Sequence, residues 1–307
     1  MVTGMRQGER TRVSTPCDGR WQAPVKALPL SVTEAEEWSN RIAAELGLFF
    51  SAGRRRSLEE RLWSRVQVLG LASQASYRAY LDSHPAEWGA LADALVVTES
   101  RFFREEASFQ ALRESILPEC IAHRETGGGR RELSLWSAGC STGEEAYTLA
   151  MIALETVPLP TIWDLRVLGS DLSARNIDHA REGIYDLRRL ESLPANWRMR
   201  YAEECLPARQ ARMGAAVRLL TTFRQHNLCG ESWPIGSQDI IVCQNVIFYF
   251  RREDQLRVLN RLYDTLRPGG ALLIGATELP LVPIRAGLTP ARFGDALAYR
   301  RPWNRWQ

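Results

Sequence analysis

The chain has 307 residues, 45% of them hydrophobic, which suffices for one large or two ordinary domains with a substantial core. Its formal net charge of +3 is too small to predict a nucleic-acid partner. The 6 cysteines form no CxxC motif and no apolar run approaches the length of a membrane span, which argues against a zinc site and membrane insertion and favours reduced thiols in the cytoplasm.

The first part of the chain divides into an extension and a helical domain. Residues 1–30 contain Arg, Gly and Pro without the apolar h-region of a signal peptide, so a flexible extension is expected there. Residues 31–97 follow a helical pattern throughout and predict a small all-α domain with its own core. Its helices are expected to begin near residues 31, 57, 74 and 85.

Two capping boxes mark the starts of the first pair of helices. Ser31 with Glu34, and Ser57 with Glu60, have the spacing at which each side chain bonds to the backbone N–H group of the other residue. Apolar residues at helical spacing follow each box, which supports both predicted helix starts.

A cluster of arginines surrounds the start of the second predicted helix: Arg54, Arg55, Arg56, Arg61 and Arg65. At helical spacing, Arg54, Arg61 and Arg65 can share one face. The cluster is consistent with a docking surface for an acidic partner. A solvated helix face is the alternative, because Glu59 and Glu60 lie among the arginines.

Residues 98–131 are expected to join the helical domain to a second domain over residues 132–307. A linker over residues 98–104 leads into a long helix that reaches about residue 123. One face of this helix is apolar and is expected to point inwards: Phe109, Leu112, Ile116 and Cys120.

The second domain opens with the stretch around which the chain is organised. A strand-like run over residues 132–138 is followed by a tight turn with Gly139 and Gly143, and a helical pattern begins at once. Strand, glycine turn and helix in this order are typical of nucleotide-binding α/β domains. Glycine is expected because the backbone must turn sharply and let a ligand approach where a Cβ would collide.

Two carboxylates, Glu144 and Glu145, occupy the first helical turn after these glycines. A pyrophosphate prefers a bare helix N-terminus and would be repelled by them. They suit a ligand with a positive group, such as the sulfonium or ammonium of S-adenosylmethionine. The alternative is that they only complement the helix dipole.

A second strand is predicted over residues 165–170, with Asp171 at its C-terminal end and a helix capped by Ser173 after it. A carboxylate in this position can accept hydrogen bonds from both hydroxyls of a ribose. The alternative role for Asp171 is to cap the next helix.

The rest of the chain is predicted to complete the sheet. Residues 184–222 are polar and less regular, and a surface elaboration is expected there. Residues 239–243 form a core strand, with Gln244 and Asn245 just past its end, where open parallel sheets bind ligands. The remaining elements are a helix over 252–266, a strand over 271–275 and a closing antiparallel pair within 282–300.

Several ordered motifs then point to a known family. They are Ser100–Glu105 (SRFFRE), Ser141–Thr148 (STGEEAYT), Ser170–Asp171 with Gly183–Tyr185, Asn227–Leu228, and Cys243–Phe250 (CQNVIFYF). Together with the helical domain they span about residues 31–300 and resemble the CheR family of chemotaxis receptor methyltransferases. The resemblance implies a Rossmann-like S-adenosylmethionine-dependent methyltransferase sheet (α/β) with a small all-α N-terminal domain. It also implies methyl transfer to receptor glutamates, giving glutamate methyl esters and S-adenosylhomocysteine.

The resemblance implies roles for individual residues. Cofactor contacts are expected from Thr98, Ser100 and Arg104 at the methionine end, Glu145 at the charged portion, Asp171 at the ribose, Asn227 and Leu228 at the adenine, and Gln244 and Asn245 at the floor near the methionyl group. Arg104 would also orient the incoming carboxylate, and Tyr249 would hydrogen-bond near the reacting centre. The alternatives are a salt bridge for Arg104 and a core position for Tyr249.

The sequence departs from the family pattern at two positions and in one loop. The family usually has Asn where Thr98 stands and Arg where Gln244 stands, and either change would weaken a cofactor or carboxylate contact. Residues 184–222 lack the Gly-rich loop with which some members hold a receptor's C-terminal pentapeptide, so no such tether is expected. The expected partner is the cytoplasmic domain of a chemoreceptor, with the protein itself a monomer.

Three other functions stay open beside receptor methylation. One is the same fold acting on a different acceptor. A second, suggested by Thr98 and Gln244, is a regulatory protein that binds the cofactor without turnover. A nicotinamide-dependent dehydrogenase is the third, and it is disfavoured by the missing third glycine and by Glu144 and Glu145.

Overall fold

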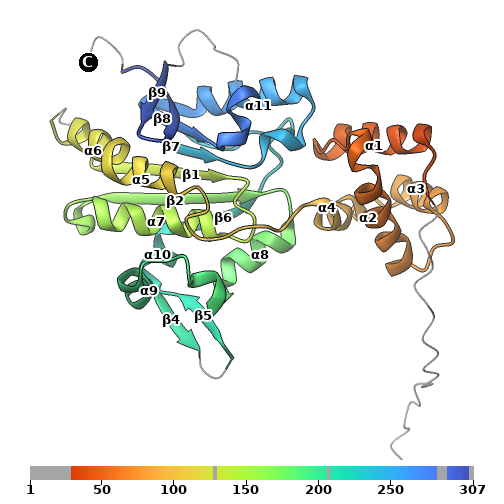
Figure 1. The fold of residues 1–307 in the computed structure, drawn as a ribbon, viewed down its shortest axis with the longest axis horizontal. Helices are drawn as coiled ribbons and strands as arrows, with labels where there is room; N and C mark the ends of the chain where they lie inside the picture. The colour runs from red at the N-terminus through yellow and green to blue at the C-terminus, as the bar shows by residue number, and fades with distance from the viewer. Residues whose placement is uncertain (1–28, 127–129, 206–207, 282–288, 304–307) are drawn as a thin grey trace, which may run out of the picture.

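The structure of this chain, a computed structural model, describes residues 29–126, 130–205, 208–281 and 289–303. Figure 1 shows a bundle of helices beside a larger helix-covered sheet, with a smaller sheet attached to the latter. Most of the predicted extension over residues 1–30 lies outside the described residues. Among the described helices, none combines the length and apolar character needed to cross a bilayer.

The bundle lies at the N-terminal end of the described chain (Figure 1). Its helices are α1 (Val32–Leu46), α2 (Arg55–Val68), α3 (Gln74–Ser83) and α4 (Glu87–Leu95). Their apolar faces meet in a separate core that contains Trp38, Ile42, Leu58, Leu62, Tyr77 and Leu91. This confirms the small all-α N-terminal domain.

The two predicted capping boxes have different outcomes. Ser31 caps α1, and both reciprocal bonds of its box with Glu34 are present. The box at Ser57 is wrong, because a 3-10 turn over Ala52–Arg54 runs directly into α2 and starts that helix at Arg55. Ser57 therefore lies inside the helix, where its hydroxyl accepts a hydrogen bond from Arg61 Nε at 3.2 Å.

The larger sheet has 7 strands in the order β6-β2-β1-β7-β8-β10-β9. They are β1 (Glu132–Ala138), β2 (Asp164–Asp171), β6 (Thr221–Gln225), β7 (Gln238–Cys243), β8 (Leu266–Ile274), β9 (Thr289–Phe293) and β10 (Ala296–Arg300). All neighbours up to β8 pair in parallel, and β10 pairs antiparallel with both β8 and β9. The predicted closing antiparallel pair is confirmed, although residues 282–288 of its predicted range lie outside the described residues.

Both faces of the sheet are buried, because successive residues of a strand point to opposite sides. Leu133 and Leu135 of β1 join a core cluster with α7 (Glu144–Thr156). Trp136 and Ala138 join the opposite cluster, which contains residues of α11 (Arg252–Thr265). A sheet covered on both faces leaves the ends of its strands as the accessible places for a ligand.

The helix that leads into the sheet is continuous but not regular. It consists of α5 (Glu106–Ala111), a π-helical stretch over Leu112–Ile116, and α6 (Leu117–Thr126). The four residues predicted to point inwards are all buried: Phe109, Leu112, Ile116 and Cys120. The prediction of one long helix is therefore correct apart from the π-helical stretch.

Residues 184–222 form more structure than the predicted surface elaboration. They contain a 3-stranded antiparallel sheet in the order β3-β5-β4, made of β3 (Ile184–Asp186), β4 (Ala202–Cys205) and β5 (Gln210–Met213). Two helices belong to the same segment: α9 (Ala195–Tyr201) and α10 (Ala215–Leu220). Its last two residues already begin the edge strand β6, which the sequence did not predict.

Among the contacts between the bundle and the α/β part, one lies at α4 and another after α1. Asp93 of α4 accepts a hydrogen bond from Ser173 Oγ at 2.5 Å, just before α8 (Ala174–Glu182). After α1, the Phe49 N–H donates to the backbone oxygen of Tyr249 at 2.7 Å. Gly47 has a φ of +78°, and a Cβ there would lie 2.5 Å from the Cβ of Cys229, so glycine allows this close approach. The two contacts hold the bundle over the C-terminal ends of the parallel strands.

Candidate functional site

A cavity of about 1160 Å³, including its open mouth, lies between the bundle and the C-terminal ends of β1, β2 and β7. All the predicted site residues except Thr98 line it: Ser100, Arg104, Glu145, Asp171, Asn227, Leu228, Gln244, Asn245 and Tyr249. The bundle contributes a wall of Leu46, Leu48, Phe49 and Phe50. Residues up to about two hundred positions apart thus share one pocket.

Thr98 does not line this pocket. Its side chain is exposed, and its hydroxyl lies 3.5 Å from the Oδ1 atom of Asn176. The neighbouring residues Val97 and Glu99 line the cavity instead. In this structure the position is therefore not placed for the cofactor contact that the resemblance implied.

The sequence predicted the sharp turn at the two glycines after β1, but not which groups exclude a side chain there. Gly139 and Gly143 have φ values of +90° and +99°, the left-handed region in which glycine is favoured. A Cβ at Gly143 would lie 2.7 Å from the Cβ of Ala180, and one at Gly139 would collide with Val246. The groups that exclude a side chain here are thus protein side chains.

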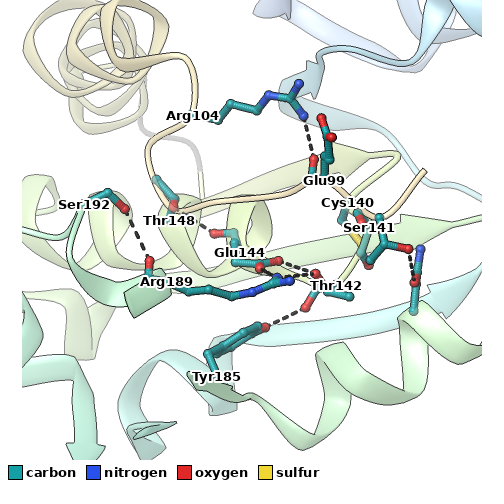
Figure 2. A network of polar contacts seen from close by, with 12 residues as sticks. Glu99, Arg104, Cys140, Ser141, Thr142, Glu144, Thr148, Tyr185, Arg189 and Ser192 are labelled. Atoms are coloured by element: carbon teal, nitrogen blue, oxygen red, sulfur yellow. Dashed lines mark hydrogen bonds and ion pairs between the residues drawn. The ribbon is translucent and has the colours of Figure 1, made fainter. Parts of the chain in front are cut away.

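The adjacent carboxylates Glu144 and Glu145 have separate roles. Glu144 is fully buried, pairs with Arg189 and accepts a hydrogen bond from Thr142 Oγ1 at 2.7 Å (Figure 2). Glu145 lines the pocket, and its Oε1 accepts a hydrogen bond from Ser137 Oγ at 2.6 Å. The expectation that both carboxylates suit a cationic ligand is therefore wrong for Glu144.

The environment of Glu145 favours a positive ligand. Burial is the main cause that raises the pKa of this carboxyl to about 8; the charges of Glu278 and Glu105 add to the rise, and the hydrogen bond from Ser137 and the charge of Arg104 oppose it. A cation placed beside Glu145 would relieve the cost of ionising it in this setting. This is the electrostatic arrangement expected for an ammonium or sulfonium.

Asp171 ties the glycine turn to the start of α8. Its Oδ2 accepts from the Ser141 N–H and its Oδ1 from the Ser173 N–H, each at 2.9 Å. Burial raises the pKa of this carboxyl, while the two backbone hydrogen bonds lower it. Ser173 itself caps α8, as predicted. Oδ1 of Asp171 also accepts from Asn176 Nδ2 at 3.3 Å, which leaves a lone pair on Oδ2 that can accept from a ligand in the pocket.

The loop after β7 supplies the floor of the pocket. Gln244 is 5% exposed, and among the described residues neither its Oε1 nor its Nε2 has a hydrogen-bond partner. Asn245 has a φ of +61°, and its Nδ2 donates to Glu105 Oε1 at 3.1 Å. A buried amide without partners is costly unless a ligand supplies them. The floor therefore has a donor and an acceptor available for a polar ligand.

Arg104 and Tyr249 lie at the same pocket. The Arg104 Nη1 donates to the backbone oxygen of Glu99 at 2.6 Å (Figure 2). Within the described residues Arg104 forms no ion pair, so the alternative of a salt bridge is not seen. The ring of Tyr249 lies 4.8 Å from the guanidinium carbon of Arg54. Both residues are thus available to a substrate that enters the pocket.

The arginine cluster of the bundle is not one docking face. Arg65 pairs with the buried Glu87 through two bonds of 2.8 and 3.0 Å. Arg61 donates to the backbone oxygens of Ala94 and Val96 at 2.7 and 3.0 Å. Their guanidinium groups hold α2 to α4, so the predicted docking role is corrected for these two and rests on Arg54, Arg55 and Arg56.

Sequence reasoning missed several residues of the site. His226 is 7% exposed and lines the pocket against the rings of Trp136 and Trp233. In the part of the chain that the structure describes, its Nε2 has no hydrogen-bond partner. Burial lowers the pKa of His226, which keeps the ring neutral. The bundle wall was missed too, because nothing local in the sequence indicates which residues meet across two domains.

The pocket fits S-adenosylmethionine, the cofactor that the motifs imply. Glu145 faces the space where a positive group is favoured, and Asp171 can accept from a ribose hydroxyl through Oδ2. The unpartnered amide of Gln244 and the neutral ring of His226 offer hydrogen bonds to polar groups. The apolar side chains of the bundle wall can cover an adenine.

Comparisons with known proteins agree with this fit. The family described as "CheR methyltransferase, SAM binding domain" matches residues 98–282, and the family described as "CheR methyltransferase, all-alpha domain" matches residues 33–96. "Chemotaxis protein methyltransferase 2" of Pseudomonas aeruginosa is 34% identical over 237 residues, covering 76% of this chain and 81% of that protein. "Chemotaxis protein methyltransferase" of Klebsiella aerogenes is 32% identical over 256 residues, covering 82% and 84%. The chain belongs to the CheR family of S-adenosylmethionine-binding methyltransferases.

Proposed function

We propose that the protein methylates glutamate side chains on the cytoplasmic domains of chemoreceptors and so forms glutamate methyl esters. The observation that supports this most is the pairing, in one pocket, of the acidic Glu145 with an arginine, Arg104, that forms no ion pair within the described residues. The first suits a cationic methyl donor and the second suits a carboxylate acceptor. The names of the relatives support a chemotaxis role.

The residues present match the needs of this reaction. When bound, S-adenosylmethionine supplies a methyl group on a positively charged sulfur. A glutamate acceptor is already ionised at neutral pH, so the protein needs no strong general base. Arg104 would orient the incoming carboxylate and Tyr249 would hydrogen-bond beside it. The apolar wall of Leu48 and Phe50 would exclude water from the reacting groups. Exclusion of water and alignment of the methyl donor with the carboxylate should together supply most of the rate enhancement.

The test is transfer of labelled methyl from S-adenosylmethionine to membranes that carry the host's chemoreceptors, followed by mild alkali. Volatile methanol released from a receptor-sized band would identify a carboxyl methyl ester on the expected substrate. Absence of label, from a protein that still binds S-adenosylhomocysteine, would contradict the proposal. The result would then favour another acceptor or a regulatory protein without turnover.

Reversing the charge of Arg55 and Arg56 should lower receptor methylation by about tenfold, because surface charges steer an acidic partner onto its docking site. Both side chains are exposed to solvent on α2, where Arg55 pairs with Glu59 and Arg56 with Glu60. Methylation rates at low and high salt would measure the effect, which salt should diminish. Charge reversal of Arg166, an exposed arginine at the far end of β2, is the matched control. Equal methylation by both variants would argue against docking at α2.

Binding of S-adenosylmethionine should strengthen as the pH rises towards 8 and level off above it. Burial raises the pKa of Glu145 to about 8, so at neutral pH this carboxyl is mostly protonated without ligand and ionises when a cation binds. Binding at pH 7 should therefore release protons. Calorimetry in buffers of different ionisation enthalpy measures this release. Glu145→Gln should abolish it, and undiminished release from that variant would show that another group titrates.

Two further expectations stay predictions. One is that residues 184–222 hold no receptor pentapeptide, and the other is that the protein acts as a monomer.

A further inference from the structure

A fully buried carboxylate lies behind the floor of the pocket. Glu278 belongs to a 3-10 turn over Ala276–Leu281, directly after β8, and is 0% exposed. Its Oε1 accepts from the N–H groups of Val246 and Ile247 at 2.7 and 2.6 Å. Its Oε2 accepts from the N–H of Asn245 at 2.7 Å and from that of Gly275 at 3.2 Å. Each carboxylate oxygen is thus occupied by two backbone donors.

These bonds hold the loop that carries the pocket floor. Three consecutive donors belong to the segment between Gln244 and Tyr249, whose side chains line the pocket. Asn245, in the middle of this contact, adopts a left-handed backbone that is uncommon for residues other than glycine. Such a conformation persists only where its surroundings fix it. Glu278 provides that fixation from the turn after β8, the strand that neighbours β7.

Gly275 leaves room for this carboxylate because it has no side chain. A Cβ at Gly275 would lie 2.7 Å from Glu278 Oε2 and 3.2 Å from the N–H nitrogen of Asn245. A side chain at this position would push the carboxylate and the loop apart. The end of β8 is therefore built around the contact between Glu278 and the loop.

Glu278 also contributes electrostatically: burial raises its pKa, while the hydrogen bonds from the backbone N–H groups of Asn245, Val246 and Ile247 lower it and favour the ionised carboxylate. Within the described residues, no arginine lies within ion-pair distance of it. Four N–H donors require an acceptor-only group, which the ionised carboxylate is. Its charge acts on Glu145, whose pKa it raises from behind the floor. Two carboxylates therefore contribute to the potential at the end of the pocket that receives the positive part of the ligand.

We propose that Glu278 is a positioning residue that fixes the Gln244–Tyr249 loop and biases the pocket towards the cationic cofactor over its neutral-sulfur product. S-adenosylmethionine carries a sulfonium that S-adenosylhomocysteine lacks, so a nearby fixed charge favours the first and assists release of the second. This inference goes beyond the proposed function, because it concerns cofactor binding alone. Its test needs no acceptor and can fail or succeed whatever the methylated substrate is.

Glu278→Gln keeps the size of the side chain and removes its charge. We expect the ratio of the dissociation constants for S-adenosylhomocysteine and S-adenosylmethionine to shift by about tenfold against S-adenosylmethionine, as measured by calorimetry. Asp239→Asn is the matched control. Asp239 is 4% exposed and pairs with Arg124 and Arg267, and it does not line the pocket. Its variant should lose stability and keep the ratio. An unchanged ratio in Glu278→Gln would overturn the electrostatic part of the proposal.

Glu278→Asp distinguishes the positioning role of Glu278 from its electrostatic role. It can also be measured if Glu278→Gln does not fold. The shorter side chain keeps the charge but cannot reach all four donors. Affinity for both ligands should then fall together by about tenfold, with the ratio between them kept within about twofold. Unchanged affinity for both ligands would show that the loop is held without Glu278. A ratio shifted as in Glu278→Gln would show that geometry, and not charge, sets the preference.

Discussion

Asp171→Asn should weaken binding of S-adenosylmethionine and S-adenosylhomocysteine alike by about 100-fold. The carboxylate accepts from the backbone N–H groups of Ser141 and Ser173, and an amide would turn one acceptor oxygen into a donor. The lost charge-assisted bond to a ribose hydroxyl costs about 1.5–3 kcal/mol of binding free energy, and the new amide donor would also face a backbone N–H group and disturb the turn. The effect falls on both ligands because both contain the same ribose.

A matched control lies at the other end of the same strand. Asp164 begins β2 and pairs with Arg166 on the surface, where both side chains are largely solvated. Asp164→Asn should leave both affinities within about twofold, because exposed ion pairs contribute little. Equilibrium dialysis or calorimetry on the two variants gives the comparison. Affinities of Asp171→Asn within a factor of about three of the original would mean that the ribose is not held by this carboxylate.

The parts of this site that could be predicted follow from local rules. Gly139 and Gly143 punctuate a short buried strand and a helical pattern, and that order fixes a strand, a turn and a helix. Because parallel strands end at the same edge, Asp171 and Gln244 were expected beside this turn although they lie far apart in sequence. The pocket brings them together for that reason.

Other parts depend on contacts that no local pattern contains. The wall of Leu48 and Phe50 exists only because the bundle docks over the sheet. Glu278 reaches back about thirty residues to the N–H groups of the loop after β7, and a lone glutamate in sequence gives no sign of that. The strands β3, β4 and β5 are too short for an alternating pattern to stand out, and pairing among them decides their conformation.

Two adjacent residues of α7 also show that a local sequence pattern does not determine which side chain faces the pocket. Glu144 and Glu145 are equivalent in the sequence, since either could complement the helix dipole or a cationic ligand. Successive helical residues point about 100° apart, so only one of them can face the pocket. The packing of α7 on the sheet turns Glu145 towards the ligand and Glu144 towards Arg189.

The ion pair between Glu144 and Arg189 should contribute strongly to the stability of the fold. Removing Arg189 should destabilise the protein more than removing Glu144. Arg189→Ala would remove the charged partner of the fully buried Glu144 carboxylate and leave it the hydrogen bond from Thr142, which should lower the free energy of unfolding by about 3–5 kcal/mol. Glu144→Ala should cost about 2–3 kcal/mol, because the Arg189 side chain is 38% exposed and water can solvate its guanidinium.

Denaturant unfolding of both variants and of the double variant measures this asymmetry. The double variant should be less destabilised than the sum of the two, because each single change leaves its partner unsatisfied. Arg188→Ala is the control, since this neighbouring arginine is exposed and should change stability by no more than about 0.5 kcal/mol. If Glu144→Ala proved as costly as Arg189→Ala, the asymmetry argument would fail, and water would not solvate the exposed arginine as its position implies. The expected order places Glu144 in the framework that orients α7, and leaves Glu145 as the carboxylate that meets the cofactor.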